Sequence, residues 1–273
     1  MTFGIDISTY QNRIDLEDAI REGVKFAIIR GSFTGTSGGY AKDDRFEQHY
    51  KNCKNLGIDV GVYHYSLATN YEEGKKEAEF LYKNCLKDKV FEYPIYIDIE
   101  SNIKGANYNE AARGFCDYIE SVGGYAAIYC NLNTANNLLN YNELSKDFDF
   151  WLAYWGNEMP SRNKYGNYGM WQFGGDTNNI RSNKIGGLIC DQDYAYKDYP
   201  EIMINQNLNN FTKKDEIDTP NDNENIPEEE IPNDEPEEEI DDNNEETDTN
   251  NFFDKIVSFF KRIIDYITSL FKN

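Results

Sequence analysis

Apolar and amphipathic segments alternate along the first half of the chain, and this alternation predicts a series of strands and helices. Each short apolar segment is typical of a buried strand, and the segment after it has the apolar spacing of a helix. The five predicted strands are residues 3–7, 25–29, 60–65, 94–100 and 125–130, and the helices after them are residues 15–23, 43–56, 72–86, 109–122 and 134–139. Successive strand–helix units indicate a parallel sheet with helices packed on its outside.

The pattern changes in the second half of the chain. Residues 150–155, 170–173 and 188–193 have the composition of strands, but Gly- and Asn-rich loops separate them and no helix is predicted between them. Five strand–helix units and three further strands give eight strands, which is enough to close a barrel. We therefore predict an α/β barrel over residues 1–211, with reactive groups at the strand ends.

Two carboxylates close the fourth predicted strand. Asp98 and Glu100 are separated by one residue, so in an extended chain they share a face, with Cα atoms about 6.6 Å apart. Two carboxyls at that spacing can divide the work of glycoside hydrolysis, because one in an apolar pocket keeps its proton while a charged neighbour stabilises positive charge on a sugar ring. An acidic strand end that faces water is the alternative for this segment taken alone.

Further polar and aromatic side chains fall at the predicted strand ends. In a closed barrel these ends meet at one mouth, so the side chains are expected near Asp98 and Glu100. They are Asp6, Arg30, Tyr63, Tyr65, Tyr129, Asn131, Tyr154, Trp155, Gln172 and Asp191.

The composition points to carboxylate chemistry. The five cysteines are scattered and include no Cys-x-x-Cys pair, which argues against a disulfide framework and against a zinc site. Only His49 and His64 are present, so a Ser/His or Cys/His arrangement or a His-rich metal site has little material. We expect no metal and no cofactor. The 21 tyrosines exceed what a core needs, and surplus tyrosine often lines sugar sites.

The net charge of −22 is distributed unevenly. Residues 1–211 hold 21 basic and 29 acidic side chains, residues 212–250 hold 2 and 18, and residues 251–273 hold 4 and 2. The barrel sequence lacks the basic, aromatic-rich surface of a nucleic-acid-binding protein. Neither a membrane-spanning apolar run nor an amino-terminal signal pattern is present, so we expect synthesis in the cytoplasm.

Eight motifs at the predicted strand ends, taken in order, resemble those of the glycoside hydrolase family 25 lysozymes over roughly residues 1–200. The motifs are Asp6-Ile7-Ser8 with Gln11, Ile28-Ile29-Arg30-Gly31-Ser32, Gly61-Val62-Tyr63-His64-Tyr65, Asp98-Ile99-Glu100, Ala127-Ile128-Tyr129, Trp151-Leu152-Ala153-Tyr154, Trp171-Gln172-Phe173 and Asp191-Gln192-Asp193. The resemblance implies an irregular (β/α)5(β)3 barrel that hydrolyses the β-1,4 bond between N-acetylmuramic acid and N-acetylglucosamine in peptidoglycan. Since no signal pattern is present, it favours a phage-type endolysin that acts on the bacterial cell wall after release.

Two other functions compete with this one. A decayed barrel that binds the cell wall without catalysis is disfavoured, because all four acids that the resemblance requires are present. A chitinase-like barrel is also disfavoured, because that family carries an additional Asp two residues before its Asp-x-Glu pair, where this chain has Tyr96.

The resemblance also implies roles for the acids. Glu100 corresponds to the general acid. Asp98 corresponds to the second catalytic carboxylate, which either attacks the anomeric carbon or orients the substrate's 2-acetamido group to attack it. Asp6 and Asp191 correspond to the other two site acids, whose charge would favour an oxocarbenium-like transition state. Asp193 competes with Asp191 for the last role, and retention, inversion and substrate assistance stay open.

Six side chains are candidates for sugar contact, because rings stack on pyranose faces while hydroxyl and amide groups bind sugar hydroxyls. They are Tyr63, Tyr65, Tyr129, Tyr154, Trp155 and Gln172. Alternation along a strand predicts that about half of the strand aromatics face the helices instead. His64 falls on the opposite face from its two tyrosine neighbours, which favours a packed histidine. Residues 34–39 are Gly-rich but lack the ending of a phosphate loop, and we interpret them as a mobile rim of the cleft.

The remaining residues predict a linker and a helix. Residues 212–250 hold four of the seven prolines and hardly an apolar side chain, which predicts a disordered acidic linker. Residues 251–273 contain three heptads with apolar residues at the same four places, which predicts an amphipathic helix. Three partners stay open for residues 252–271: further copies of the chain in a homo-oligomer, an anionic membrane surface, and the barrel itself.

Overall fold

The computed structural model describes residues 1–176 and 180–212. The structural statements below concern those residues. The linker expected at 212–250, apart from its first residue, and the helix expected at 251–273 lie outside the described residues.

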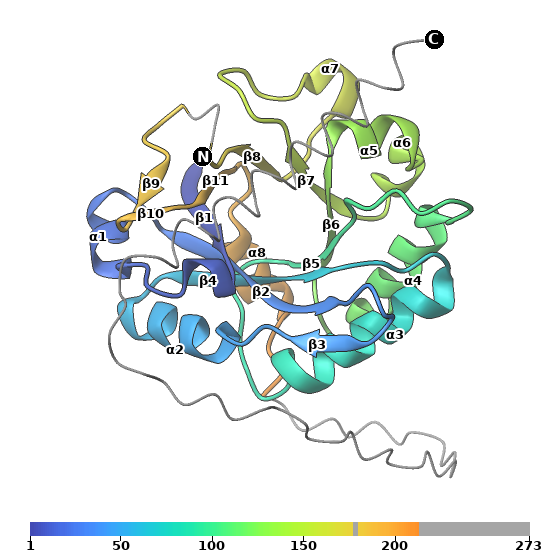
Figure 1. The fold of residues 1–273 in the computed structure, drawn as a ribbon, viewed down its shortest axis with the longest axis horizontal. Helices are drawn as coiled ribbons and strands as arrows, with labels where there is room; N and C mark the ends of the chain where they lie inside the picture. The colour runs from blue at the N-terminus through green and yellow to red at the C-terminus, as the bar shows by residue number, and fades with distance from the viewer. Residues whose placement is uncertain (177–179, 213–273) are drawn as a thin grey trace, which may run out of the picture. The chain divides into compact units, whose positions relative to one another are not determined.

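Eight strands close into a ring, because β1 pairs with both β2 and β11 (Figure 1). In the order in which they pair, the strands are β1 (Thr2–Ile7), β2 (Phe26–Thr34), β4 (Asp59–Tyr65), β5 (Ile95–Asp98), β6 (Ala126–Asn131), β7 (Asp149–Ala153), β8 (Met170–Gly174) and β11 (Asp191–Ala195). The first seven run parallel to one another, as the alternating pattern predicts. The predicted eight-stranded α/β barrel is therefore confirmed.

The last strand differs from its prediction in position and direction. A strand was expected at residues 188–193, but these residues divide between a hairpin, β9 (Lys184–Ile185) and β10 (Leu188–Ile189), and the beginning of β11. The hairpin turns at Gly186 and Gly187, both at positive φ. β11 runs antiparallel to β8 and to β1, with Asp191 opposite Asp6. Asp191 thus begins an antiparallel strand at the mouth where the parallel strands end.

Helices follow the first five parallel strands and lie outside the ring (Figure 1). They are α1 (Leu16–Arg21), α2 (Phe46–Leu56), α3 (Tyr71–Leu81) with a π-helical turn at Tyr82–Leu86, α4 (Tyr108–Ser121) and α5 (Leu132–Asn137). Short helices at α6 (Tyr141–Leu144) and α7 (Arg162–Tyr165) were not predicted, and α8 (Tyr199–Gln206) follows β11. None of the described helices is long and apolar enough to cross a membrane.

The Gly-rich segment at residues 34–39, interpreted above as a mobile rim of the cleft, is part of a hairpin. β2 extends to Thr34, and the chain turns back into β3 (Tyr40–Lys42), which pairs antiparallel with β2. Gly35 and Gly39 form the turn, with the Gly35 amide donating to the Gly39 carbonyl at 2.8 Å.

The alternation of strand side chains builds two cores. One lies between the ring and the helices and includes Ile95 and Ile97 of β5. The other fills the barrel interior and includes Tyr96, whose ring lies 5.1 Å from that of Trp151 in an edge-on contact. Asp98 follows Tyr96 on the same face, so the interior core forms the floor beneath it.

Two glycines let the outer helices α3 and α4 approach each other closely. A Cβ atom on Gly74 would lie 2.0 Å from the Ala111 carbonyl oxygen, and one on Gly114 would lie 1.9 Å from the Tyr71 carbonyl oxygen. No larger side chain fits at either crossing point without moving the helices apart.

The five cysteines are buried, and none forms a disulfide. This agrees with the expectation of scattered thiols in and around the core.

Candidate active site

Four acids meet at the mouth of the barrel. Asp6 lies near the end of β1, Asp98 ends β5, Glu100 lies two residues beyond it, and Asp191 begins β11. All four line one cavity of about 270 Å³, together with Tyr63, Tyr129, Trp151, Trp155 and Gln172. The structure thus brings together the four acids that the sequence predicted.

The two acids after β5 occupy different environments. Asp98 is 5% exposed, and its Oδ1 atom has no hydrogen-bond partner among the described residues. Glu100 lies beyond the strand, not within it as expected, and solvent reaches its side chain although the cavity walls surround it. Its Oε1 atom accepts a hydrogen bond from the Tyr129 hydroxyl at 3.3 Å.

A chain of hydrogen bonds connects Glu100 to Asp6 across the cavity. The Trp155 Nε1 group, which can only donate, bonds Oε1 of Gln172 at 3.0 Å, so the other amide atom of Gln172 is the donor. That Nε2 group donates to Asp6 Oδ2 at 2.9 Å. The Tyr129 hydroxyl donates to Oε1 of Gln172 at 2.9 Å.

The single proton of Tyr129 makes this chain directional. Tyr129 lies within reach of both Glu100 and Gln172 but can donate to only one at a time. When Glu100 carries a proton, it can donate to Tyr129, and Tyr129 then donates to Gln172. The network is fully satisfied with Glu100 protonated and Asp6 charged.

Asp193 supports Asp6 from inside the barrel, a role that the sequence analysis missed. Asp193 is fully buried, and its Oδ1 atom accepts a hydrogen bond from Trp151 Nε1 at 2.8 Å. Burial raises the pKa of Asp193, and the nearby charges of Asp6 and Asp191 raise it further. This favours the protonated form of Asp193, which can donate a hydrogen bond to the neighbouring Asp6 carboxylate. Asp193 lies two residues after Asp191 and so shares a face of the strand with it, which was the signal for its position in the sequence.

Burial raises the pKa of every acid in the cluster, and repulsion between carboxylates adds to this for Asp6, Asp98 and Asp191. Burial raises the pKa of Asp6 to about 7, although hydrogen bonds from Gln172 and Asp193 act in the opposite direction. Burial, followed by the charges of Asp6 and Glu100, raises the pKa of Asp191. The cluster consequently favours bound protons at neutral pH. A positive charge placed among its members would lower these pKa values and cause protons to be released.

The same effects act on the Asp98–Glu100 pair. Burial raises the pKa of Asp98 well above its ordinary range, and the charges of Glu100 and Asp6 add to this, while Arg30 lowers it. Burial also raises the pKa of Glu100, and the hydrogen bond from Tyr129 lowers it. Burial therefore favours the protonated form of both Asp98 and Glu100. Positive charge beside Asp98 is needed for Asp98 to ionise while Glu100 keeps its proton.

Two neighbouring cavities extend the central one into a groove. A cavity of about 370 Å³ lies on one side and shares Glu100, Tyr129, Trp155 and Gln172 with it. A cavity of about 260 Å³ lies on the other side and shares Asp6, Tyr63, Asp98, Glu100 and Asp191. Since Glu100 lines all three cavities, it lies near the middle of the groove.

All six predicted sugar-contact residues border this groove. Tyr63, Tyr129, Trp155 and Gln172 line the central cavity, Tyr65 lines the smaller neighbour, and Tyr154 lines the larger one. None of the six belongs to the core beneath the helices, whereas the strand aromatics Phe150, Trp171 and Phe173 do, as alternation along the strands predicts. Tyr154 is the most open of them, with 47% of its surface exposed.

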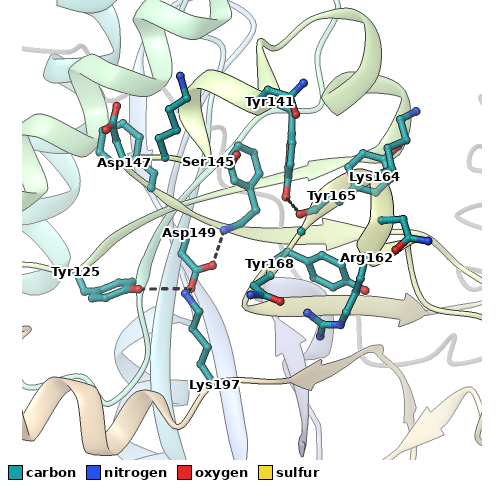
Figure 2. A pocket seen from close by; sticks show the side chains of 17 residues that line it. Tyr125, Tyr141, Ser145, Asp147, Asp149, Arg162, Lys164, Tyr165, Tyr168 and Lys197 are labelled. Carbon is teal, nitrogen blue, oxygen red and sulfur yellow. Dashed lines mark hydrogen bonds and ion pairs between the residues drawn. The ribbon is translucent and has the colours of Figure 1, made fainter.

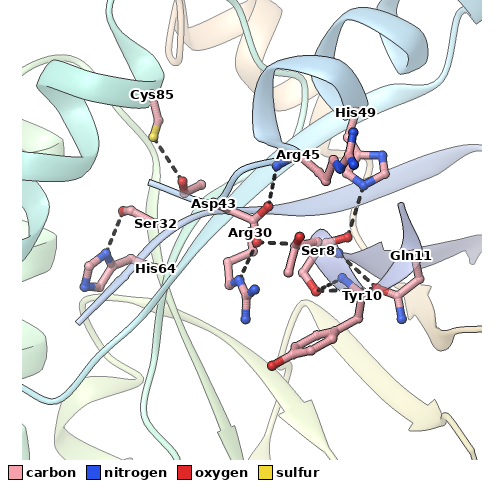
Figure 3. A network of polar contacts seen from close by, with 12 residues as sticks. Ser8, Tyr10, Gln11, Arg30, Ser32, Asp43, Arg45, His49, His64 and Cys85 are labelled. Carbon is pink, nitrogen blue, oxygen red and sulfur yellow. Dashed lines mark hydrogen bonds and ion pairs between the residues drawn. The ribbon is translucent and has the colours of Figure 1, made fainter. Parts of the chain in front are cut away.

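Arg30 gives one end of the groove a positive charge, held in place by a polar network (Figure 3). Its Nε group donates to Asp43 Oδ2 at 2.7 Å, and the same oxygen accepts the Thr9 amide at 3.1 Å. Its guanidinium carbon lies 5.3 Å from the centre of the Tyr10 ring. The Asp43 carboxylate thus fixes Arg30 to the loop after β1, a long-range contact without a local sequence signal.

His64 is packed inside the protein, as its strand phase indicated. It is fully buried, with Ser32 Oγ 2.7 Å from its Nδ1 atom and Thr34 Oγ1 3.1 Å from its Nε2 atom. Glu77 of α3 completes the group by accepting a hydrogen bond from Thr34 at 2.6 Å. The cluster is sealed beneath α3, so these residues join strands to a helix and do not face the groove.

The described residues include no group of three or more His, Cys, Asp or Glu side chains with the arrangement of a metal site.

Comparison with known proteins gives a family match over most of the barrel. The model of glycosyl hydrolases family 25 matches residues 5–181. Lysozyme M1 of Streptomyces globisporus is 28% identical over 204 residues, which is 67% of this chain and 67% of that protein. The autolytic lysozyme of Clostridium acetobutylicum is 27% identical over 161 residues, which is 58% of this chain but only 46% of that protein.

Solved structures agree with the fold. The crystal structure of the CTP1L endolysin has a TM-score of 0.63 at 23% identity, and the match covers 75% of this chain and 70% of that chain. At this level of identity the likeness supports the barrel, while the chemistry has to be argued from the residues of this chain.

Proposed function

This chain belongs to glycosyl hydrolase family 25, whose lysozymes hydrolyse peptidoglycan, and we propose that it cleaves the β-1,4 bond between N-acetylmuramic acid and N-acetylglucosamine. It is accordingly a glycoside hydrolase. The observation that supports glycoside hydrolysis is the groove, in which four acids gather at the centre and aromatic rings border both sides, while the choice of bond rests on the family resemblance. A glycan strand laid along it would place a glycosidic bond at Glu100.

In the proposed mechanism Glu100 is the general acid. It lies in the middle of the groove where a leaving oxygen can reach it, and the Tyr129–Gln172 chain accepts a hydrogen bond from its protonated form. Protonation of the leaving oxygen would break the glycosidic bond and leave positive charge on the sugar ring. That charge would lower the pKa of the buried Asp98 and favour its ionised form.

Asp98 would then stabilise the positive sugar, either by attacking its anomeric carbon or by orienting the 2-acetamido group of the sugar to do so. Asp6 and Asp191 line the same cavity, and positive charge on the sugar would lower their pKa values, so that they would add negative charge beside it. Proton NMR of the first product separates retention from inversion, since the anomeric configuration is recorded before it equilibrates.

Release of reducing ends from purified cell walls by the full chain tests the bond assignment. New reducing ends are expected on N-acetylmuramic acid, and a Glu100→Gln protein is the matched control. Reducing ends on N-acetylglucosamine would contradict the proposed bond. A wild-type protein that binds walls and releases nothing would support the alternative of a non-catalytic wall-binding module.

We also propose that the chain acts as a phage-type endolysin, made in the cytoplasm and active on the cell wall after release. The CTP1L endolysin, whose structure has a similar fold, is a protein of this kind. Residues 252–271 would add a homo-oligomer contact or a contact with an anionic membrane. The solution mass of the full chain and its flotation with anionic vesicles distinguish the two, because a monomer that floats excludes the first and a multimer that does not float excludes the second.

A further inference from the structure

A second cavity lies at the opposite end of the barrel from the groove. Its volume is about 540 Å³, and its walls come from the residues before β6, β7 and β8, from α7, and from the residue Lys197 that follows β11 (Figure 2). Parallel strands begin at this end, whereas the groove lies where they finish. None of the acids of the proposed mechanism lines it.

The cavity is positively charged although the barrel as a whole is acidic. Four basic side chains line it, against the two acids Asp147 and Asp149. The basic side chains are Lys146, Arg162, Lys164 and Lys197. Residues 1–211 as a whole carry 29 acids and 21 basic side chains, so this local excess is opposite in sign to its surroundings.

Two of the cations have no acidic partner within the described part of the chain. Lys197 pairs with Asp149 at 2.8 Å, and Lys146 pairs with Glu143 at 2.6 Å. No salt bridge to Arg162 or Lys164 is found among residues 1–176 and 180–212. Both belong to the short helix α7 at the edge of the cavity.

Aromatic rings hold Arg162 in place. Its guanidinium carbon lies 4.8 Å from the centre of the Tyr168 ring and 4.5 Å from that of Tyr196, and these rings stand nearly perpendicular to each other at 82°. The Tyr168 hydroxyl donates to the Pro160 carbonyl at 2.9 Å, which fixes that ring. These two rings fix the position of the guanidinium group, whose N–H groups are strong donors to the oxygens of an anion.

The floor of the cavity is also built in advance. Asp149 is buried and accepts hydrogen bonds from the Tyr199 hydroxyl at 2.6 Å and from Lys197 at 2.8 Å. A Cβ atom on Gly169 would lie 1.8 Å from the Tyr199 hydroxyl, so only glycine lets this network close. Tyr125, whose hydroxyl lies 3.5 Å from Asp149 Oδ2, completes it (Figure 2).

We propose that this cavity is a second binding site, which takes an oxyanion, phosphate or carboxylate, carried on a sugar or polyol. Arg162 binds the oxyanion, while the tyrosine rings and asparagine amides of the walls accept the sugar or polyol. A polymer of such units would be held by the end of the barrel that lies away from the groove. The site does not depend on the proposed bond specificity, since no residue of the groove takes part in it.

Titration of the full, nitrogen-15-labelled chain with four probes tests the site by NMR. The probes are glucose 6-phosphate, glucuronate, glucose and inorganic phosphate. We expect an anionic sugar to shift the amide signals of residues 162–168 at millimolar concentration. Glucose and inorganic phosphate should bind more weakly than the anionic sugar. A response to glucose 6-phosphate alone indicates a phosphate-bearing polymer, and a response to glucuronate alone indicates a carboxylate-bearing one. If glucose binds as tightly as the anionic sugar, the proposed recognition of the anion is wrong. If inorganic phosphate binds as tightly, the proposed recognition of the sugar is wrong.

Substitutions assign the binding to the cavity. Arg162→Gln should weaken binding of the anionic sugar by about tenfold, because it removes the charged donor. Arg162→Lys should weaken it too, since it keeps the charge and loses the planar group. Arg21→Gln, on the exposed face of α1, is the matched control and should leave affinity unchanged. Unchanged affinity in Arg162→Gln, or shifts confined to the residues of the groove, would overturn the proposal.

Discussion

Gln172 on β8 donates a hydrogen bond to Asp6 on β1 at 2.9 Å, although the two residues are 166 positions apart in the chain. The antiparallel strand β11 lies between β8 and β1 in the ring, so the bond passes over it. Gln172 also accepts hydrogen bonds from Tyr129 and Trp155. One amide side chain therefore connects the proposed general acid to the acid on the other side of the cavity.

Replacing Gln172 with Met should break this connection while keeping the side chain's size. The hydrogen bond from Gln172 lowers the pKa of Asp6, so its loss should raise that pKa above about 7. We expect kcat/KM on cell walls to fall by about tenfold to a hundredfold, because two donors and one acceptor in the site lose their partner. Carbon-13 NMR titration of the Asp6 carboxyl measures the pKa directly, and an unchanged value would contradict the proposed link.

Glu100→Gln should abolish turnover and leave the fold intact. The amide keeps the shape of the side chain but has no acidic proton, and general acid catalysis is typically worth about 10²–10⁴ in rate. Asp98→Asn should also cause a severe loss, measured by the release of reducing ends. Glu100 is open to solvent, so the thermal midpoint of Glu100→Gln should stay close to that of wild type. An effect below about tenfold would exclude Glu100 from the acid role.

Asp193→Asn should retain much of the activity, whereas Asp193→Leu should lose it. Burial favours a protonated Asp193 that donates to Asp6, and an asparagine amide can donate to Asp6 in the same way. Leucine cannot, and it would also leave the Trp151 Nε1 group without its acceptor. The pH profile of kcat/KM separates the two explanations, because a change in Asp6 protonation moves the profile and a merely structural defect does not. Equal loss in both variants would contradict proton sharing.

The sequence predicted the barrel and its acids because both depend on local patterns. Alternating apolar segments fix the parallel strands, and Asp98 stands in phase with Tyr96 on the inward face of β5. The direction of β11 could not be predicted, since the alternation of apolar and polar residues is the same in both directions of a strand. Its position was also misplaced, because the residues of the β9–β10 hairpin have the composition of a strand. The roles of Asp193 and Arg30 depend on contacts between distant segments, which no local pattern records.

Gly114→Ala should destabilise the barrel through the contact between α3 and α4. Its new Cβ atom would meet the Tyr71 carbonyl oxygen at 1.9 Å, which forces the helices apart. We expect a loss of about 1–3 kcal/mol in the free energy of unfolding, measured by urea denaturation. Gly39→Ala is the control, because a Cβ atom there would meet nothing within 4 Å. Comparable losses in both variants would show that the helix crossing is not the cause.

The acid cluster should make the folded protein less stable as the pH rises. Asp6 has a pKa of about 7 and Asp191 of about 9 in the folded chain, against an ordinary value of 3.8 for each. Between these values the folded chain holds more protons than the unfolded chain, so the free energy of unfolding decreases as the pH increases. The decrease begins near pH 4 and continues to about pH 9, at about 1.4 kcal/mol per pH unit for each additional proton held.

Urea denaturation at a series of pH values measures this slope. Asp191→Asn should flatten it, because the amide does not titrate and also removes a neighbouring charge from Asp6. Glu17→Gln is the control. It also replaces a carboxylate with an amide, but on the exposed face of α1 away from the mouth, and the slope should stay as in wild type. A protein whose stability rises between pH 5 and pH 8, or an Asp191→Asn slope equal to that of wild type, would show that the mouth acids are ionised together in the folded chain.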